Sequence, residues 1–275
     1  MIRLVILAKT RIIQGIMKIL GVTLSEKSKQ EAQVQYAQWL QEQGSPIHLH
    51  QIVTVNPEFI MEAQKNGAYR DVLNGADMAL VDGAGIQYIA ALKKNPVSRY
   101  TGVDLVEDLL KEVHAKKGTI YAIGLRSKEV GEATEEIIST RYPNLTFLYE
   151  AGESPAGSTR PVFTELNDKE KEKENVLCEK IRSSNASVLF VAYGSPTQDI
   201  WIARNKEKLL GVKIAVGVGG AFDYISGAVP RAPRLVRAIG MEWLVRLIVQ
   251  PHRINRIITA TIRFPWTIVK SIFKE

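Results

Sequence analysis

Short apolar runs alternate with longer amphipathic stretches along most of the chain. Runs typical of buried strands lie at about 47–55, 78–81, 118–124, 187–193 and 214–217, and stretches of helical periodicity follow most of them. Strands that alternate with helices in this way favour a parallel sheet with helices packed on both of its faces. The pattern therefore predicts an α/β fold with a mostly parallel, doubly wound sheet.

Two further stretches belong to this core but follow the alternation less closely. Residues 19–24 predict a short strand, and Ser25 begins a polar helix that ends near Gly44. Residues 149–174 contain Gly, Ser and Pro followed by a charged run. That composition predicts a surface loop and then the start of a helix.

Both ends of the chain are basic and apolar. We predict an N-terminal extension (1–17), an α/β core (18–233) and a basic amphipathic helical C-terminal tail (234–275). The extension fits a surface-lying amphipathic helix or a first strand and turn. The tail carries an apolar stripe at helical spacing and aromatic residues suited to a lipid headgroup boundary, namely Ile254, Ile257, Ile258, Ile262, Trp243, Phe264 and Trp266.

The formal charge of +7 is concentrated at these two ends. Residues 1–25 carry +4 and residues 234–275 carry +6, which leaves −3 for residues 26–233. This distribution favours an anionic membrane surface or a polyanionic ligand at the ends, and it argues against a nucleic-acid partner. The alternative for the tail is a helical hairpin that packs on the core with solvated arginines.

The sequence also bears on location. No apolar run approaches the ~18–20 residues that span a bilayer, and no secretory cleavage site is evident. Cys178 is the only cysteine, so an intrachain disulfide is excluded, and we expect it to have a packing or surface role in a helix rather than a catalytic one. We therefore expect a peripheral protein at the cytoplasmic face of the membrane.

Candidate functional residues follow the predicted strands. Asp82 comes directly after the run at 78–81, where a carboxylate suits either general-base chemistry or an N-cap for a helix from Ile86. After the run at 214–217, a glycine turn would let a ligand approach the backbone, and Asp223 could accept hydrogen bonds from sugar hydroxyls. A tight turn with a capping aspartate explains the same residues. The turn after 187–193 combines short polar side chains and backbone donors that suit a phosphate or a sugar.

Several familiar sites are missing. The third glycine of a dinucleotide-binding fingerprint is absent, and there is no P-loop and no Asp-x-Asp metal motif. His48 and His50 alternate onto one strand face, but no third ligand is apparent nearby, so we expect no metal site. We accordingly predict no cofactor.

Several motifs together carry a resemblance to a known family. They are ILGV near residue 19, TVNPE from Thr54, VDGAGI around Asp82, Arg99 before TGVDL, VAYGSPTQDIW, GVGGAFDYISGAVPRAP and EWLVRLIVQPHRINR. They cover roughly residues 18–256 in order, and on them the chain resembles the WecG/TagA/CpsF family of bacterial cell-envelope glycosyltransferases. The chain departs from the family pattern in its first residues, in the loop after Glu150 and at Tyr193.

The resemblance implies a Rossmann-like core and an inverting, metal-independent transfer. An N-acetylmannosamine-type sugar would pass from a UDP-sugar to a polyprenyl-diphosphate-linked N-acetylglucosamine during envelope polysaccharide or teichoic acid synthesis. It also implies that family members can form homo-oligomers. Asp82 would be the general base with Thr54 and Asn56 in the same pocket; Arg99, Gly194, Gln198, Gly219, Gly220 and Asp223 would bind substrate; and Arg246, Arg253 and Arg256 would close over the diphosphate.

Two other classes of protein remain open from the residues alone. One is an NAD(P)-dependent oxidoreductase that uses the glycine turns, and the other is a non-catalytic module that binds a nucleotide or phosphate. Thermal-shift titration with NAD(H) and with UDP separates these hypotheses.

Overall fold

The computed structural model describes residues 16–44, 48–92, 97–152, 165–233, 235–236, 242–251 and 254–272, without the side chains of residues 242, 243, 246 and 272. Most of the predicted N-terminal extension therefore lies outside the described residues.

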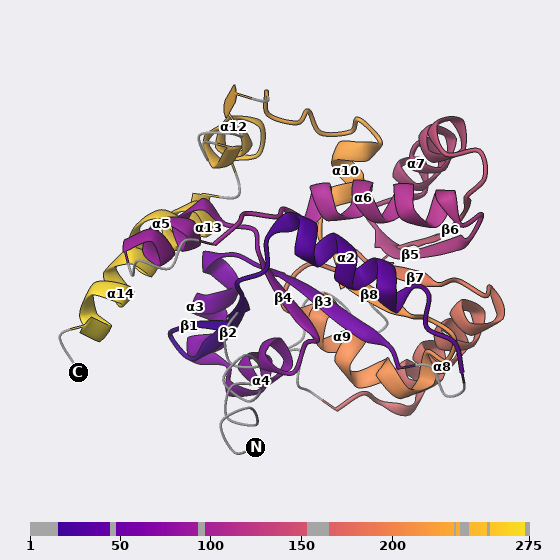
Figure 1. The fold of residues 1–275 in the computed structure, drawn as a ribbon, viewed down its shortest axis with the longest axis horizontal. Helices are drawn as coiled ribbons and strands as arrows, with labels where there is room; N and C mark the ends of the chain where they lie inside the picture. Colours follow the sequence, from indigo (N-terminus) through magenta and orange to yellow (C-terminus); the bar gives the residue numbers. More distant parts are fainter. Residues whose placement is uncertain are drawn as a thin grey trace, which may run out of the picture.

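A six-stranded, fully parallel sheet forms the centre of the molecule (Figure 1). Four of its strands are buried along their whole length, because helices cover both faces. The predicted α/β class and parallel sheet are confirmed. In spatial order the strands are β4 (Met78–Val81), β3 (His50–Val55), β8 (Ile214–Gly217), β7 (Val188–Val191), β5 (Thr119–Leu125) and β6 (Thr146–Ala151).

The edge strand β6 corrects one sequence-based prediction. Residues 149–151 were expected in a loop, but they complete β6, which pairs with β5 from Thr119↔Thr146 onward. Phe147 is buried, whereas the flanking Thr146 and Leu148 are exposed. A short edge strand with so little buried surface lacks the apolar run that marks the central strands.

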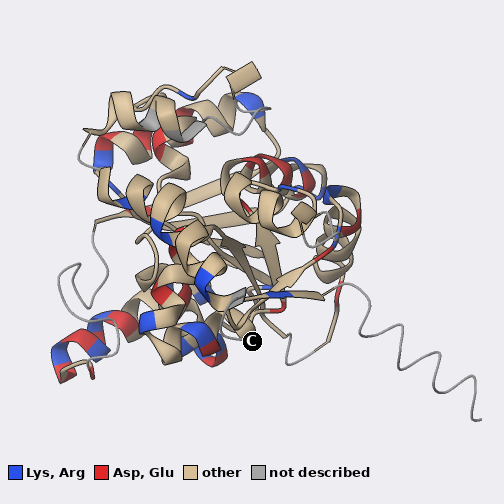
Figure 2. Ribbon diagram, turned by 90° about the vertical axis from the view of Figure 1, so that its left-hand side faces the viewer, with Lys and Arg blue, Asp and Glu red and all other residues tan. Residues whose placement is uncertain are grey.

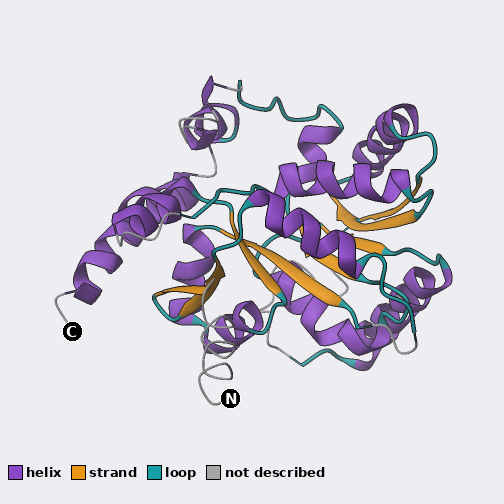
Figure 3. Cartoon of the chain, in the orientation of Figure 1, coloured by secondary structure: helices purple, strands orange, loops and turns teal. Residues whose placement is uncertain are grey.

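Helices form a layer on each face of the sheet (Figure 3). The alternation of side chains along a strand divides the core between these layers, so that Ile52 packs in one cluster and its neighbour Val53 in another. One layer contains α2 (Lys29–Trp39), α6 (Gly102–Ala115), α7 (Lys128–Arg141) and α10 (Ala221–Ile225), and the other contains α3 (Pro57–Lys65), α4 (Gly67–Asn74), α8 (Asp168–Ser183) and α9 (Thr197–Asn205).

A small hairpin precedes this core. β1 (Ile16–Ile19) pairs antiparallel with β2 (Val22–Ser25), where the sequence predicted a single short strand. Ile19 and Val22 are fully buried against residues of α3 and α4, so the hairpin is part of the core. Cys178 is also buried, which gives it the packing role among those expected, and Trp201 is buried as well.

The described part of the tail consists of α12 (Glu242–Val249), α13 (Ile254–Ile258), a π-helical turn η3 (Thr259–Arg263) and α14 (Phe264–Ile272). Phe264 is fully buried in the cluster that includes α3, so its expected place at a headgroup boundary is wrong. In Figure 1 the yellow α14 lies beside α5 (Ala84–Leu92). The tail thus joins the core through α14. This agrees in part with the alternative prediction for the tail, a helical hairpin that packs on the core.

Other tail side chains remain outside the core. Ile254, Ile262 and Trp266 are 43%, 63% and 60% exposed. Charged residues lie mainly on the helices and loops around the sheet, including this tail (Figure 2). None of the described helices has the length and hydrophobicity that crossing a bilayer requires.

Candidate active site

The predicted site residues gather at the carboxyl ends of neighbouring strands. Asp82 follows β4, Asn56 follows β3, the glycine turn follows β8, and Gly194 follows β7. Because β4, β3, β8 and β7 are adjacent and parallel, these residues share one edge of the sheet. Ligands of open α/β sheets bind at this edge.

Asp82 is held between two backbone segments. Its N–H donates to Val55 O at the end of β3 (2.9 Å), and its carbonyl oxygen accepts from Arg99 Nε (2.6 Å). The segment of Arg99 runs beside β4, because Val81 and Arg99 form an isolated parallel bridge. Asp82 is half-buried. Its backbone is therefore fixed beside Thr54–Asn56, the TVN turn at the end of β3, with Arg99 at hydrogen-bond distance.

Thr54 and Asn56 flank the same turn. Thr54 is buried, and a Cβ at Gly102, the first residue of α6, would lie 3.3 Å from Thr54 Oγ1. Asn56 Oδ1 accepts from the backbone N–H groups of Glu58 (2.9 Å) and Phe59 (3.2 Å). Asn56 is therefore the N-cap of α3.

Gly83 allows the loop of Asp82 to lie against α3. A Cβ at Gly83 would come within 2.4 Å of Pro57 Cδ. The helix after Asp82 is α5, which begins at Ala84 rather than at the predicted Ile86. The glycine thus sets the close approach of the strand-end carboxylate to the beginning of α3.

Gln198 supports the glycine turn after β8. Its side chain is buried, and its Oε1 accepts from Gly219 N–H (2.9 Å). Gly219 has φ +51°, a left-handed conformation that favours glycine, and Gly220 is the cap residue before α10. The hydrogen-bond network thus gives Gln198 a positioning role. Gly194 has φ +81°, and its carbonyl oxygen accepts a hydrogen bond from Gln198 N–H (2.9 Å).

Gly217, the last residue of β8, has no room for a side chain. A Cβ there would lie 2.5 Å from both Asp199 Oδ1 and Gln198 Nε2. We expect Gly217→Ala to destabilise the protein by about 1–3 kcal/mol in urea unfolding, because both neighbours are buried. Gly67→Ala is the matched control, since only the flexible Arg70 guanidinium lies near its Cβ position, at 3.8 Å. Equal stability of the two variants would contradict the prediction.

Asp223 pairs with a residue that sequence reasoning missed. Asp223 Oδ1 lies 3.4 Å from Arg126 Nε, and Arg126 directly follows β5. The Asp223 side chain is 15% exposed. Arg126 thus extends the polar edge of the sheet to a fifth strand. The position of an arginine directly after a strand was the available signal.

A second missed pair anchors the segment after α10. Arg231 Nη2 donates to Asp104 Oδ1 (2.6 Å), and Thr101 Oγ1 donates to Asp104 Oδ2 (2.7 Å). Burial raises the pKa of Asp104, but the Thr101 hydrogen bond and the Arg231 charge outweigh burial, and the pKa lies below its usual value. The SGAVPRAP segment is therefore tied to the first turn of α6, near Thr54.

The tail reaches the site through Arg256. Arg256 Nε lies 2.5 Å from Glu58 Oε2, and Glu58 is in the first turn of α3, two residues after Asn56. A Cβ at Gly85 would lie 3.9 Å from Ala260 O, which places η3 against the beginning of α5, three residues after Asp82. Arg253 and the side chain of Arg246 lie outside the described residues.

A buried network lies behind the turn after β7. Asp199 is completely buried, and Tyr69 Oη donates to Asp199 Oδ2 (3.0 Å) while contacting Ser195 Oγ (2.8 Å). Burial raises the pKa of Asp199 to about 7. The network therefore contains a carboxyl group that binds its proton more tightly in the folded chain than in the unfolded one.

This shift predicts a pH dependence of stability. Between pH 3.8 and about 7, the unfolded chain releases the Asp199 proton while the folded chain retains it. The free energy of unfolding should therefore fall as the pH rises through this window, and it should fall less in Asp199→Asn. Urea unfolding of both proteins from pH 4 to 8 measures the difference. Parallel pH profiles for the two proteins would refute the assignment.

The histidines correct another prediction. His48 and His50 were expected to lack a third ligand, but Asp77 lies beside them in the fold. Asp77 is 27 residues beyond His50 and belongs to the loop before β4, so local spacing could not reveal the neighbour.

Comparison with known proteins assigns this site to a family. The sequence model of the glycosyl transferase WecG/TagA/CpsF family matches residues 17–275. The chain belongs to this family. An N-acetylglucosaminyldiphosphoundecaprenol N-acetyl-β-D-mannosaminyltransferase from Staphylococcus aureus strain MRSA252 is 30% identical over 207 residues, which cover 75% of this chain and 74% of the relative. The protein of the same description from strain NCTC 8325 / PS 47 is 28% identical over the same shares of both chains.

Membership of the WecG/TagA/CpsF family confirms the resemblance drawn from the motifs. It indicates a glycosyltransferase, and the oxidoreductase and non-catalytic alternatives are set aside.

Proposed function

We propose that the protein transfers an N-acetylmannosamine-type sugar from a UDP-sugar to a polyprenyl-diphosphate-linked N-acetylglucosamine, with inversion and without a catalytic metal. The relatives' names, which specify an N-acetyl-β-D-mannosaminyl group and an N-acetylglucosaminyldiphosphoundecaprenol acceptor, support the donor sugar and the acceptor. The product would enter a cell-envelope polysaccharide or a teichoic acid.

The position of Asp82 carries this proposal. A carboxylate at the carboxyl end of β4, held beside the TVN turn, is placed to act as a general base. In the proposed step, Asp82 takes the proton of an acceptor hydroxyl as its oxygen attacks the anomeric carbon. The bond from that carbon to the UDP oxygen breaks, and UDP leaves with the bonding electrons. The attack from the face opposite UDP inverts the anomeric centre.

Arginines supply the positive charge that the departing UDP requires. Arg256 of α13 pairs with Glu58 at the beginning of α3, and Arg99 donates to the Asp82 carbonyl. Guanidinium groups bind diphosphate oxygens through paired N–H donors and stabilise charge that develops in the transition state. We propose that Arg256 exchanges its Glu58 contact for the diphosphate when substrate binds, together with Arg246 and Arg253.

The same tail suits a lipid-linked acceptor. Its segment 234–275 carries +6, and exposed apolar side chains such as Ile262 and Trp266 lie among these charges. Cations attract anionic headgroups, while Trp and Ile insert at the headgroup boundary. We therefore propose that the protein works as a peripheral protein at the cytoplasmic face of the membrane. Homo-oligomer formation stays a prediction of the resemblance.

The test is to incubate the purified protein with UDP-N-acetylmannosamine, UDP-N-acetylglucosamine or UDP-glucose and a lipid-linked diphosphate N-acetylglucosamine. Mass spectrometry should detect an acceptor extended by one N-acetylhexosamine with UDP-N-acetylmannosamine. Transfer from another donor alone would reject the proposed sugar, and absence of product with every donor would reject the proposed acceptor.

A further inference from the structure

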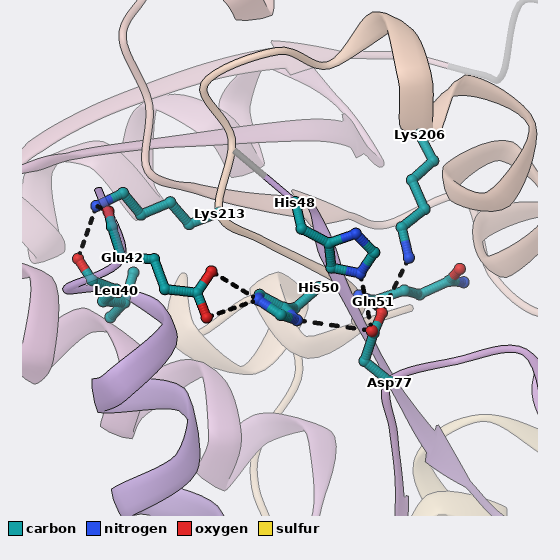
Figure 4. A network of polar contacts seen from close by, with 8 residues as sticks. All are labelled: Leu40, Glu42, His48, His50, Gln51, Asp77, Lys206 and Lys213. Atoms are coloured by element: carbon teal, nitrogen blue, oxygen red, sulfur yellow. Dashed lines mark hydrogen bonds and ion pairs between the residues drawn. The ribbon is translucent and has the colours of Figure 1, made fainter. Parts of the chain in front are cut away.

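A cluster of metal-ligating side chains lies at the amino ends of β3 and β4, opposite the strand ends that carry Asp82 (Figure 4). His50 begins β3, His48 precedes it, and Asp77 precedes β4. One ligand atom from each of these three residues lies within 4.8 Å of the other two. The cluster is separate from the proposed active site and has no part in the mechanism above.

The two carboxylate oxygens of Asp77 have different surroundings. Oδ2 accepts from Gln51 N–H (2.9 Å) and from Lys206 Nζ (3.0 Å). Oδ1 lies 3.0 Å from His48 Nε2 and 3.6 Å from His50 Nδ1. The hydrogen bonds to Oδ2 thus fix the orientation of the carboxylate, and Oδ1 points toward both imidazole rings (Figure 4).

The ring of His50 is also fixed. It is 8% exposed and stacks on Trp39 with the ring centroids 4.2 Å apart. Its Nε2 lies 2.9 and 3.1 Å from the two carboxylate oxygens of Glu42. Because an ionised carboxylate only accepts hydrogen bonds, Nε2 carries the proton of this contact.

The proton on His50 Nε2 determines whether Nδ1 is a donor or an acceptor. In a neutral imidazole Nδ1 then carries a lone pair, and His50 Nδ1 is buried with no hydrogen-bond partner. It faces Asp77 Oδ1, which is also an acceptor. The buried lone pair of His50 Nδ1 and a lone pair of the partly exposed Asp77 Oδ1 repel each other, and a cation between them turns the repulsion into coordination.

We propose that His48 Nε2, His50 Nδ1 and Asp77 Oδ1 bind a late first-row divalent metal ion, for which Zn²⁺ is the natural probe. Tetrahedral zinc ligands at their usual bond lengths lie about 3.3 Å from one another. Asp77 Oδ1 lies 3.0 and 3.6 Å from the two imidazole nitrogens, and all three atoms lie within 4.8 Å of one another. Two imidazoles and a carboxylate suit Zn²⁺ and disfavour Mg²⁺, which prefers oxygen ligands.

The surroundings match those of metal-binding histidines. Glu42 accepts from the far nitrogen of His50, which orients the ring and makes its other nitrogen a stronger ligand. Lys213 Nζ donates to the carbonyl oxygens of Leu40 (2.9 Å) and Glu42 (2.7 Å), which holds the segment of Glu42 in place. The positive charges of Lys206 and Lys213 are equal in number to the negative charges of Asp77 and Glu42.

The proposed ion has a structural role. His50 and Thr54 are four residues apart on β3, which corresponds to roughly 13 Å along the strand. The ion would join the beginning of β3 to the loop before β4 and, through Glu42, to the segment after α2. It would therefore raise the stability of the sheet edge without touching the substrates.

The experiment is a calorimetric titration of the untagged, metal-free full chain with Zn²⁺ alone, together with thermal unfolding. The wild type should bind one Zn²⁺ at this site and unfold at a higher temperature with Zn²⁺ but not with Mg²⁺. His48→Gln, at a side chain 57% exposed, should retain the fold and lose the site. Glu42→Gln should weaken binding by roughly tenfold to a hundredfold.

His114→Gln is the control, because it removes a histidine from α6 and should leave Zn²⁺ binding unchanged. Equal Zn²⁺ affinities of the wild type and His48→Gln would overturn the proposal, and so would an unchanged affinity of Glu42→Gln. Equal affinities are also the result expected if a proton, rather than a metal ion, lies between His50 and Asp77.

Discussion

Asp82→Asn is expected to lower the rate of sugar transfer by about 10²–10⁴, the range that a positioned general base contributes. Asparagine has nearly the same shape as aspartate, and it cannot accept the proton of the acceptor hydroxyl. The backbone contacts of Asp82 with Val55 and Arg99 use its N–H and carbonyl groups, so the substitution leaves them in place. The rate is measured with a lipid-linked diphosphate N-acetylglucosamine and saturating UDP-N-acetylmannosamine.

The matched control is Asp71→Asn, which makes the same chemical change at an exposed position on α4. Asp71→Asn should retain the wild-type rate, and both variants should unfold close to the wild-type temperature. Near-normal turnover by Asp82→Asn would remove this residue from the role of base. A large loss of stability in Asp82→Asn would instead assign it a structural role.

Arg256→Ala is expected to lower turnover by about 10²–10³, comparable to the loss of one donor that stabilises a transition-state charge. Arg256 pairs with Glu58, and the two side chains are 46% and 27% exposed. An ion pair as exposed as this contributes little to stability, so the melting temperature should change only slightly. Arg256→Lys should recover part of the rate, because lysine keeps the charge but loses the paired donors.

Glu58→Gln separates catalysis by Arg256 from docking of the tail. If Arg256 binds the departing diphosphate, Glu58→Gln should leave most of the activity, since the arginine keeps its charge and loses only a competing partner. If the Glu58–Arg256 pair merely docks the tail, the two single variants should lose the same activity and the double variant no more than either. The second pattern would refute the role proposed for Arg256.

The sequence was most informative where local pattern and burial coincide. β7 and β8 are buried along their whole length, and both appeared as apolar runs that ended in glycine-containing turns. Asn56-Pro57 likewise marked the beginning of α3, because the capping side chain and the first-turn proline act locally. Such signals placed the candidate residues at the carboxyl ends of the strands.

What the sequence missed depends on contacts between distant segments. Glu58 and Arg256 are 198 residues apart, and Arg231 reaches Asp104 across 127 residues. Neither pair has a local signature. Gln198 shows a related difficulty, since its family position implied substrate contact while its Oε1 accepts from Gly219 N–H. Only the packing of α9 against β8 makes that hydrogen bond visible.

The measurement that tests the central claim most directly is equilibrium binding of the UDP-sugar to Asp82→Asn, made on the preparation whose turnover is measured. A residue that acts only on the acceptor proton should leave donor affinity near the wild-type value while turnover is lost. Loss of donor affinity in proportion to the loss of turnover would contradict the account, because Asp82 would then be a binding residue and the base would lie elsewhere.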